Sequence, residues 1–201
     1  MEVEIKKLRC PICGQPIAMG DNICKYCKKP ITISTFNDIL DMNMPKLNQA
    51  IRGYGQLQQD APEFPGVNRS IAFIYLKLKQ YDKAKEYFEK AIADDFNEPE
   101  NYFYAAVSAL KGKKAFIASR NDIDQIETLL RDGAISIAPQ GIYYFFWAYI
   151  RYDYHHRKCY RVTPDYSELL KQAHLLGTSE ADIYQLFDIL NVECPQALKS
   201  I

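Results

Sequence analysis

The sequence lacks the features that mark several common classes of protein. None of its apolar runs approaches the roughly 20 residues that a membrane-spanning helix needs. The charges balance, with 25 Lys and Arg against 25 Asp and Glu, so the chain has no overall basic field for nucleic acid. The Walker loop, Gly-x-Ser-x-Gly, His-Glu-x-x-His and Gly-x-Gly-x-x-Gly are all missing. These absences favour a non-enzymatic protein with no membrane partner.

The first residues also lack an apolar leader, since Met1–Lys7 is rich in charge. We therefore expect a cytoplasmic protein, in which disulfides are rare. With 201 residues, 48% hydrophobic and 25% charged, the chain has the composition of an ordinary soluble protein. This length is enough for one substantial core and one small module.

Four of the six cysteines form two close pairs, Cys10 with Cys13 and Cys24 with Cys27. Two Cys-x-x-Cys turns supply four thiolates, which suits tetrahedral zinc and leaves no open position for catalysis. We therefore expect one structural Zn²⁺. A disulfide pair would need an oxidising compartment, and a redox dithiol would need a βαβ setting that the sequence does not show.

Each cysteine pair is followed by a Pro-Ile step, Pro16-Ile17 and Pro30-Ile31, which predicts two similar knuckles that face one another. Gly14 follows the first pair, where a tight turn often needs positive φ. The segment Cys10-Pro11-Ile12-Cys13-Gly14 and its partner Cys24-Lys25-Tyr26-Cys27 resemble the zinc-ribbon family. We assign the ribbon to residues 1–33. Ribbons bind nucleic acid, dock on proteins or only stabilise a fold, so the resemblance does not identify a partner.

Residues 1–30 carry six Lys and Arg against three Asp and Glu. One interpretation is a face that binds phosphate. The other is that lysines offset the net negative charge that four thiolates leave around one Zn²⁺, and we favour this second interpretation.

Residues 34–45 are interpreted as a connector, and its length leaves open whether the ribbon packs on the rest of the chain. From Pro45 the apolar residues follow helical spacing. A helix is predicted over 46–60, with Leu47, Ala50, Ile51, Tyr54 and Leu57 on one face. Pro62, Pro65 and Gly66 end it.

Two further apolar faces predict a close helix pair over 68–94. The first comprises Ile71, Ala72, Ile74, Tyr75 and Leu78, and the second Ala84, Tyr87, Phe88, Ala91 and Ile92. The pair resembles a tetratricopeptide repeat through Tyr75, Tyr81, Ala84, Phe88 and Ala91. Phe96 replaces the usual Pro, and Ala72 the usual Gly. A step of 34 residues back from Ala84, Phe88 and Phe96 gives Ala50, Tyr54 and Pro62, as in an earlier, incomplete repeat.

The resemblance implies a mainly α fold, an α-solenoid of helix pairs over 46–201. A helix is expected at 99–111, an insertion at 113–121, and helical patterning again from Ile123 to Ile135. A further pair is expected at about 141–157 and 165–176. A last helix, about 179–190, is expected to cap the stack, because each repeat exposes an apolar face to the next.

The alignment places candidate partner-binding residues on the first helices of the repeats, in a concave groove. These are Arg69, Phe73, Lys77, Phe103 and Lys111. Phe73 stands where the carboxylate clamp of peptide-binding relatives has Asn, so a mixed aromatic and basic groove is expected. Tyr143 and Phe146 belong to the aromatic run 143–150, which is either a buried central helix or part of the groove.

The most basic stretch is His155–Arg161. It suits either a phosphate or acidic-peptide site or the solvated end of a helix. Two other candidate sites find no further support in the sequence. One is a nucleophile and base formed by Cys159 and His155, and the other is a second metal site formed by Cys159, His156 and Cys194.

These features together predict a non-enzymatic adaptor that binds a protein or peptide in its helical groove, with zinc in a structural role. An alternative is a nucleic-acid-binding accessory protein that uses the ribbon and segment 151–161. A third possibility is an enzyme with a pocket among the aromatic residues of 143–154.

Overall fold

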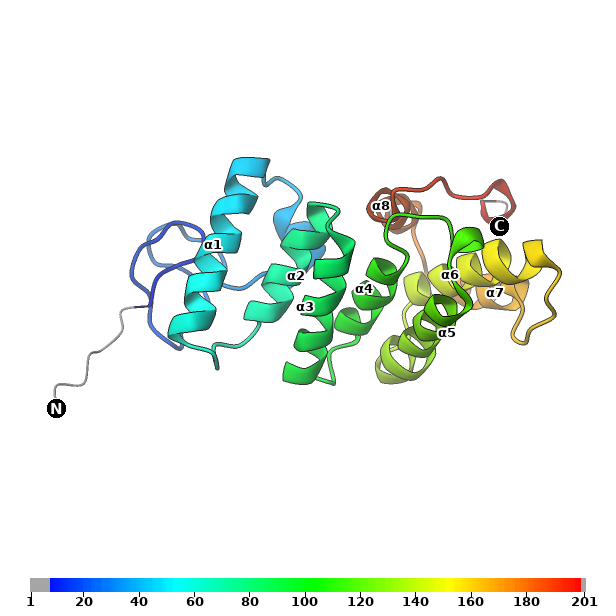
Figure 1. Cartoon of the computed structure of the whole chain (residues 1–201), viewed down its shortest axis with the longest axis horizontal. Coiled ribbons are helices and arrows are strands. Elements are labelled where there is room, and N and C mark those ends of the chain that lie inside the picture. Colours follow the sequence, from blue (N-terminus) through cyan, green and yellow to red (C-terminus); the bar gives the residue numbers. More distant parts are fainter. Residues whose placement is uncertain (1–7, 200–201) are drawn as a thin grey trace.

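The computed structural model describes residues 8–199 and shows an elongated row of helices with the cysteine-rich segment at one end (Figure 1). The mainly α fold that the sequence predicts is confirmed, with helices packed in neighbouring pairs. The α-helices are α1 (Met44–Asp60), α2 (Val67–Lys77), α3 (Tyr81–Asp94), α4 (Pro99–Ala109), α5 (Arg120–Thr128), α6 (Gly141–Ile150), α7 (Tyr166–Leu175) and α8 (Glu180–Leu190). Shorter helical turns are η1 (Phe36–Ile39), η2 (Ala115–Ile117), η3 (Leu129–Ile135), η4 (Arg151–His155), η5 (His156–Lys158) and η6 (Gln196–Leu198). None of the helices within residues 8–199 has the length and apolar content that a membrane crossing requires.

The cysteine-rich segment consists of two knuckles that repeat each other after 14 residues. In the first, the amide of Cys10 donates to the carbonyl of Gln15, and in the second the amide of Cys24 donates to that of Lys29. Gly14 and Lys28 occupy equivalent places, and both have positive φ, at 75° and 59°. The expected pair of similar knuckles is therefore present, each closed by one isolated β-bridge.

The first knuckle packs directly on α1. A Cβ built on Gly53 would lie 2.4 Å from the carbonyl oxygen of Pro11, so this glycine lets the two backbones approach. Gln49 Nε2 donates to the carbonyl of Ile12 at 3.1 Å, next to that contact. The connector left open whether the ribbon packs or moves freely, and in the structure it is docked.

The chain that leaves the second knuckle is anchored to α1 and α2. The buried Tyr54 hydroxyl donates to the carbonyl of Ile31 at 2.7 Å. The amide of Ile33 donates to Ser70 Oγ at 2.8 Å, and that hydroxyl donates to Gly66. Ile31 and Ile33 are both buried, so these hydrogen bonds lie in a dry interface where unmade ones would be costly.

Local sequence accounts for the starts of several helices. Asn43 Oδ1 accepts the amide of Lys46 at the start of α1, and Ser119 and Asp165 cap α5 and α7 in the same way. Pro99 opens α4, where its missing amide costs nothing. The predicted insertion forms the 3₁₀ turn η2 and the loop before α5.

The helix pairs meet through an aromatic core. The ring centre of Phe73 in α2 lies 5.2 Å from that of Phe88 in α3 and 5.0 Å from that of Tyr104 in α4, and both pairs meet edge to face. Further along, Phe103 of α4 lies 4.8 Å from Tyr143 of α6. Large rings spaced along successive helices therefore join the repeats into one continuous core.

A charged cluster is buried where α5 meets η4. Glu127 Oε1 lies 3.1 Å from Arg151 Nε and 3.1 Å from His155 Nε2, and all three residues are less than 10% exposed. Burial lowers the pKa of Arg151, while the charge of Glu127 acts to raise it. The Arg151 guanidinium also lies 5.4 Å from the centre of the Trp147 ring.

We expect Glu127→Ala to destabilise the protein by about 3–5 kcal/mol, because it leaves the Arg151 guanidinium buried without its counter-ion. Asp124→Ala on the same helix is the control, since it removes an exposed ion pair with Arg120 and should change stability little. Urea unfolding followed by circular dichroism measures both. Equal losses for the two variants would contradict a structural role for the cluster.

The last helix does not close the end of the stack as expected. Instead, α8 lies against α6 and α4, where the ring of Phe187 meets that of Tyr149 at 5.1 Å. The Tyr81 hydroxyl donates to the carbonyl of Ile189, and Gln185 donates to Asn37 of η1. The apolar residues Leu186, Phe187, Ile189 and Leu190 of α8 are buried in this position against α4 and α6.

The face formed by α2, α4 and α6, here called the helix-A face, is therefore largely covered. Phe36 of η1 lies 6.3 Å from Phe73 and 6.2 Å from Tyr104, so η1 covers α2 and α4. Beside it, α8 covers α4 and α6. The open groove that the sequence predicts on these first helices is filled by the chain itself.

Candidate metal centre and partner surfaces

The four cysteines of the two knuckles converge on one point. The Sγ atoms of Cys10 and Cys27 lie 4.0 Å apart, those of Cys13 and Cys24 lie 3.6 Å apart, and all four lie within 4.8 Å of one another. Four thiolates bound at about 2.3 Å to tetrahedral zinc lie about 3.8 Å apart. These separations are too long for disulfides, and all four cysteines are free. The arrangement could hold a metal ion such as zinc.

The environment of the thiols bears on metal binding. Burial raises the pKa of Cys10 to about 12 and also raises the pKa of Cys27. The pKa of Cys24 falls to about 6, chiefly because the backbone amide of Cys27 hydrogen-bonds its sulfur. A metal ion must therefore displace protons from Cys10 and Cys27 at neutral pH, and one ligand is already ionised.

Among the described residues, these cysteines form the only group of three or more potential ligands close enough to share a metal ion. Cys159 is exposed and Cys194 is half-buried, with a thiol that contacts the Pro195 carbonyl. The fold does not bring Cys159, Cys194 and His156 together as a second site. His156 packs on the rings of Tyr152 and Tyr166 instead.

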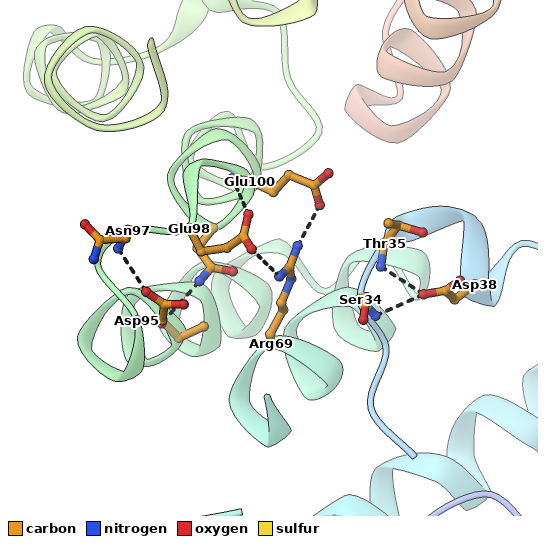
Figure 2. A network of polar contacts seen from close by, with 10 residues as sticks. Ser34, Thr35, Asp38, Arg69, Asp95, Asn97, Glu98 and Glu100 are labelled. Carbon is orange, nitrogen blue, oxygen red and sulfur yellow. Dashed lines mark hydrogen bonds and ion pairs between the residues drawn. The ribbon is translucent and has the colours of Figure 1, made fainter. Parts of the chain in front are cut away.

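Arg69, a candidate for partner binding, is engaged within the protein (Figure 2). Its guanidinium donates to Glu98 at 2.9 Å and to Glu100 at 2.7 Å, and its side chain is only 17% exposed. Burial raises the pKa of Glu100, and the charge of Arg69 acts to lower it. Arg69 thus joins α2 to the start of α4, and its charge is not available to a partner.

The aromatic candidates require a correction. Phe73, Phe103, Tyr143 and Phe146 are each at most 4% exposed and belong to the core between successive helices. The burial alternative holds for Tyr143 and Phe146, and none of the four candidate rings lines an open groove. The repeat alignment placed these rings on the helix-A face, but η1 and α8 cover that face.

The two lysine candidates lie nearer the surface. Lys111 is about half exposed and pairs with Asp82 at 2.8 Å. Lys77 is half-buried in the last turn of α2, and no ion pair joins it to another described residue. The five groove candidates therefore do not form one open basic and aromatic surface.

Segment 151–161 is also largely used within the fold. Arg151 and His155 belong to the buried cluster with Glu127, and Arg157 pairs with the buried Asp153 at 2.6 Å. Lys158 places its ammonium 3.7 Å from the centre of the Tyr154 ring. With these charges paired or stacked, the segment does not offer the continuous phosphate-binding face that the nucleic-acid alternative requires.

An open cavity of about 1540 Å³ lies between α6, α7, α8 and the segment after α8. It exceeds the roughly 300–1,000 Å³ of ordinary small-molecule sites. Its aromatic lining residues are Phe145, Tyr149, Tyr152, Tyr184 and Phe187, and its charged ones are Lys114, Asp153, Arg157, Glu180, Asp188, Glu193 and Lys199. Tyr184 is 76% exposed at its edge, whereas Phe187 is buried.

Three of the polar residues that line the cavity, Tyr149, Asp153 and Arg157, already have partners within the fold. Asp153 accepts the amide of Phe116 at 2.8 Å and pairs with Arg157, which fastens the inserted turn η2 to η4. The Tyr149 hydroxyl accepts the amide of Ala115 at 3.3 Å, and burial raises the pKa of this phenol, so it stays neutral. These groups hold the wall of the cavity in place rather than forming a general acid and base pair.

Sequence patterns do not predict this cavity. Tyr149 and Tyr152 fall within the aromatic stretch for which a pocket was considered, but the opposite wall comes from α8 and residues 191–199. Those last residues have no periodic pattern, and only the fold-back of α8 brings them beside α6. No local pattern in the sequence signals this wall of the cavity.

Comparison with known proteins agrees with the repeat. Residues 70–93, in α2 and α3, match the family model of the tetratricopeptide repeat. No curated protein and no solved structure gives a significant match to the chain. The repeat match, the tight four-cysteine cluster and the helical body fit a zinc ribbon joined to tetratricopeptide-like repeats.

Proposed function

We propose that this protein is a cytoplasmic, non-enzymatic adaptor that holds one structural Zn²⁺ and binds a protein segment in the cavity between α6, α7 and α8. Tetratricopeptide repeats are typically interaction modules, and residues 70–93 match one. The four thiols at nearly tetrahedral spacing support the zinc assignment. The cytoplasm is proposed because its reducing conditions keep such thiols free.

The observation that carries the partner site is the cavity itself. Because η1 and α8 cover the helix-A face, the expected concave site moves to the adjoining opening. Its volume suits a peptide chain better than a metabolite. Aromatic walls with charges of both signs suit a peptide that has apolar anchors and polar backbone groups.

Tyr184→Ala is expected to weaken partner binding at least about tenfold, because Tyr184 is an exposed aromatic anchor at the edge of the cavity. Phe96→Ala is the matched control, since Phe96 is 67% exposed and lies outside the cavity. Tagged variants purified from the native host, with the co-purifying proteins quantified by mass spectrometry, make the comparison. A partner retained equally by both variants would place its binding site elsewhere.

A further inference from the structure

The two knuckles have the same backbone hydrogen bonds but very different surroundings. In the first, Pro11 is buried against Gly53 of α1, and Ile12 is half-buried. The residues 14 positions later are Lys25, with a side chain 77% exposed, and Tyr26, 61% exposed. One knuckle is therefore seated on a helix, and the equivalent turn of the other is open to solvent.

The open turn carries both apolar and basic groups. Ile23 and Tyr26 expose more than half of their surfaces, which is unusual for large apolar residues on so small a module. Lys25, Lys28 and Lys29 flank them and are all exposed. We call Ile23, Lys25, Tyr26, Lys28 and Lys29 the second-knuckle face.

Only one carboxylate pairs directly with a lysine of this face. Within residues 8–34 the one acidic residue is Asp21, whose carboxylate lies 3.7 Å from Lys25. Residues 35–201 carry 19 Lys and Arg against 22 Asp and Glu, so the chain has a basic tip and an acidic body. A zinc-bound set of four thiolates explains some of these lysines but not the exposed isoleucine and tyrosine beside them.

The first knuckle shows how a turn of this kind packs against a helix. The turn at Pro11 lies on a glycine, and the carbonyl of Ile12 accepts a side-chain amide from the helix at position 49. The second knuckle has the same backbone hydrogen bonds, and its equivalent turn at Lys25 and Tyr26 is exposed. A helix with a small residue at the contact point would fit this turn in the same way.

We propose that the second-knuckle face docks an acidic α-helix of a partner protein. A small residue of that helix lies against the Lys25-Tyr26 turn, its apolar residues cover Ile23 and Tyr26, and its carboxylates pair with the three lysines. This surface lies on the ribbon, apart from the cavity, so the inference extends the proposed function without resting on it.

Two other occupants fit the observations less well. Nucleic acid would meet an acidic helical body next to the basic tip and would leave Ile23 without an apolar partner. A second copy of this chain cannot offer α1 as the docking helix, because its own first knuckle already covers the Gly53 contact. A helix from a different protein satisfies both the charge and the apolar groups.

The test uses the full chain, loaded with zinc, and a fluorescent helical probe. The probe copies residues 43–60, with Lys46→Glu and Arg52→Glu to make it acidic and a side-chain lactam on the face away from Gly53 to hold the helix. Fluorescence anisotropy should show that the protein binds the acidic probe. A probe with the unaltered 43–60 sequence should bind at least about tenfold more weakly. Tyr26→Ala should weaken binding of the acidic probe by about tenfold or more.

Met19→Ala is the matched control, because Met19 is an exposed apolar residue of the ribbon outside the second-knuckle face. It should change affinity by less than about twofold, and zinc content and circular dichroism should be the same in all variants. Equal affinity of the Tyr26→Ala and Met19→Ala proteins would overturn the proposal. So would absence of probe binding, tighter binding of a single-stranded oligonucleotide through the same residues, or self-association abolished by Tyr26→Ala.

Discussion

Replacing Cys24 with serine is expected to abolish zinc binding and detach the ribbon from α1. Cys24 is fully buried among the other three thiols, and its sulfur lies 3.6 Å from that of Cys13. Structural zinc contributes about 10–16 kcal/mol of apparent binding free energy to small folded modules. Two isolated β-bridges and a few turns cannot replace a contribution of that size.

The helical body should survive this change, because its aromatic core from α2 to α7 does not depend on the knuckles. Metal analysis should show one zinc in the wild-type chain and none in Cys24→Ser. Circular dichroism should keep most of its helical signal, while limited proteolysis should cut the chain before residue 34. Cys159→Ser is the control, since that thiol is exposed and far from the cluster in sequence. Zinc retained by Cys24→Ser would contradict the four-ligand site.

The thiol pKa values set the direction of the pH dependence. Burial in the folded knuckles raises the pKa of Cys10 and Cys27. The thiols of a ribbon opened by loss of metal return to ordinary pKa values, which also lie above neutral pH. From either state zinc binding at pH 7 releases protons, so affinity should rise with pH. Cys24 has a pKa lowered to about 6, so its thiolate is present above that pH and is lost below it. Calorimetry in buffers of different ionisation enthalpy counts the released protons. A proton count of zero at pH 7 would contradict these assignments.

Gly53→Ala is expected to displace the ribbon from α1. The added methyl carbon would lie 2.4 Å from the carbonyl oxygen and 2.5 Å from the Cα of Pro11, and a backbone cannot rotate away as a side chain can. The ribbon must then shift off α1, which also strains the hydrogen bond from Gln49. The overpacking costs about 1–3 kcal/mol even after the alanine improves the helix.

Gly55→Ala provides a control within the same helix. Nothing lies within 4 Å of the Cβ position at Gly55, so this change should stabilise the protein by up to about 1 kcal/mol. Hydrogen exchange of residues 8–33 should increase in Gly53→Ala and stay unchanged in Gly55→Ala. Equal exchange in the two variants would show that the ribbon does not depend on the Pro11 contact.

Local patterns in the sequence predicted a large part of this fold. The Cys-x-x-Cys spacing and the repeated Pro-Ile step predicted two matching knuckles, because a short turn of this kind permits few backbone paths. The helix that carries Ala84 and Phe88 was predicted with nearly correct bounds, since apolar periodicity is a property of neighbouring residues. The repeat match at 70–93 falls on the same pair.

The availability of side chains could not be predicted in this way. Arg69 and Phe73 lie on the helix face that the repeat pattern indicates, but Glu98, Glu100 and the ring of Phe36 cover them. Those partners come from segments 29 to 37 residues away in the sequence. Whether a side chain is buried depends on which distant segment packs on it and removes water from its apolar surface. Helical periodicity does not contain that information.

The sequence by itself determined the helices, their pairing in repeats and the four-cysteine cluster, because these depend on spacings of a few residues or on one fixed period. The tertiary structure alone decided that the first knuckle is seated on Gly53, that α8 folds back over α4 and α6, and that a cavity remains beside it. These outcomes depend on competition among apolar faces for limited contact area. Such a competition is settled only when the whole chain packs.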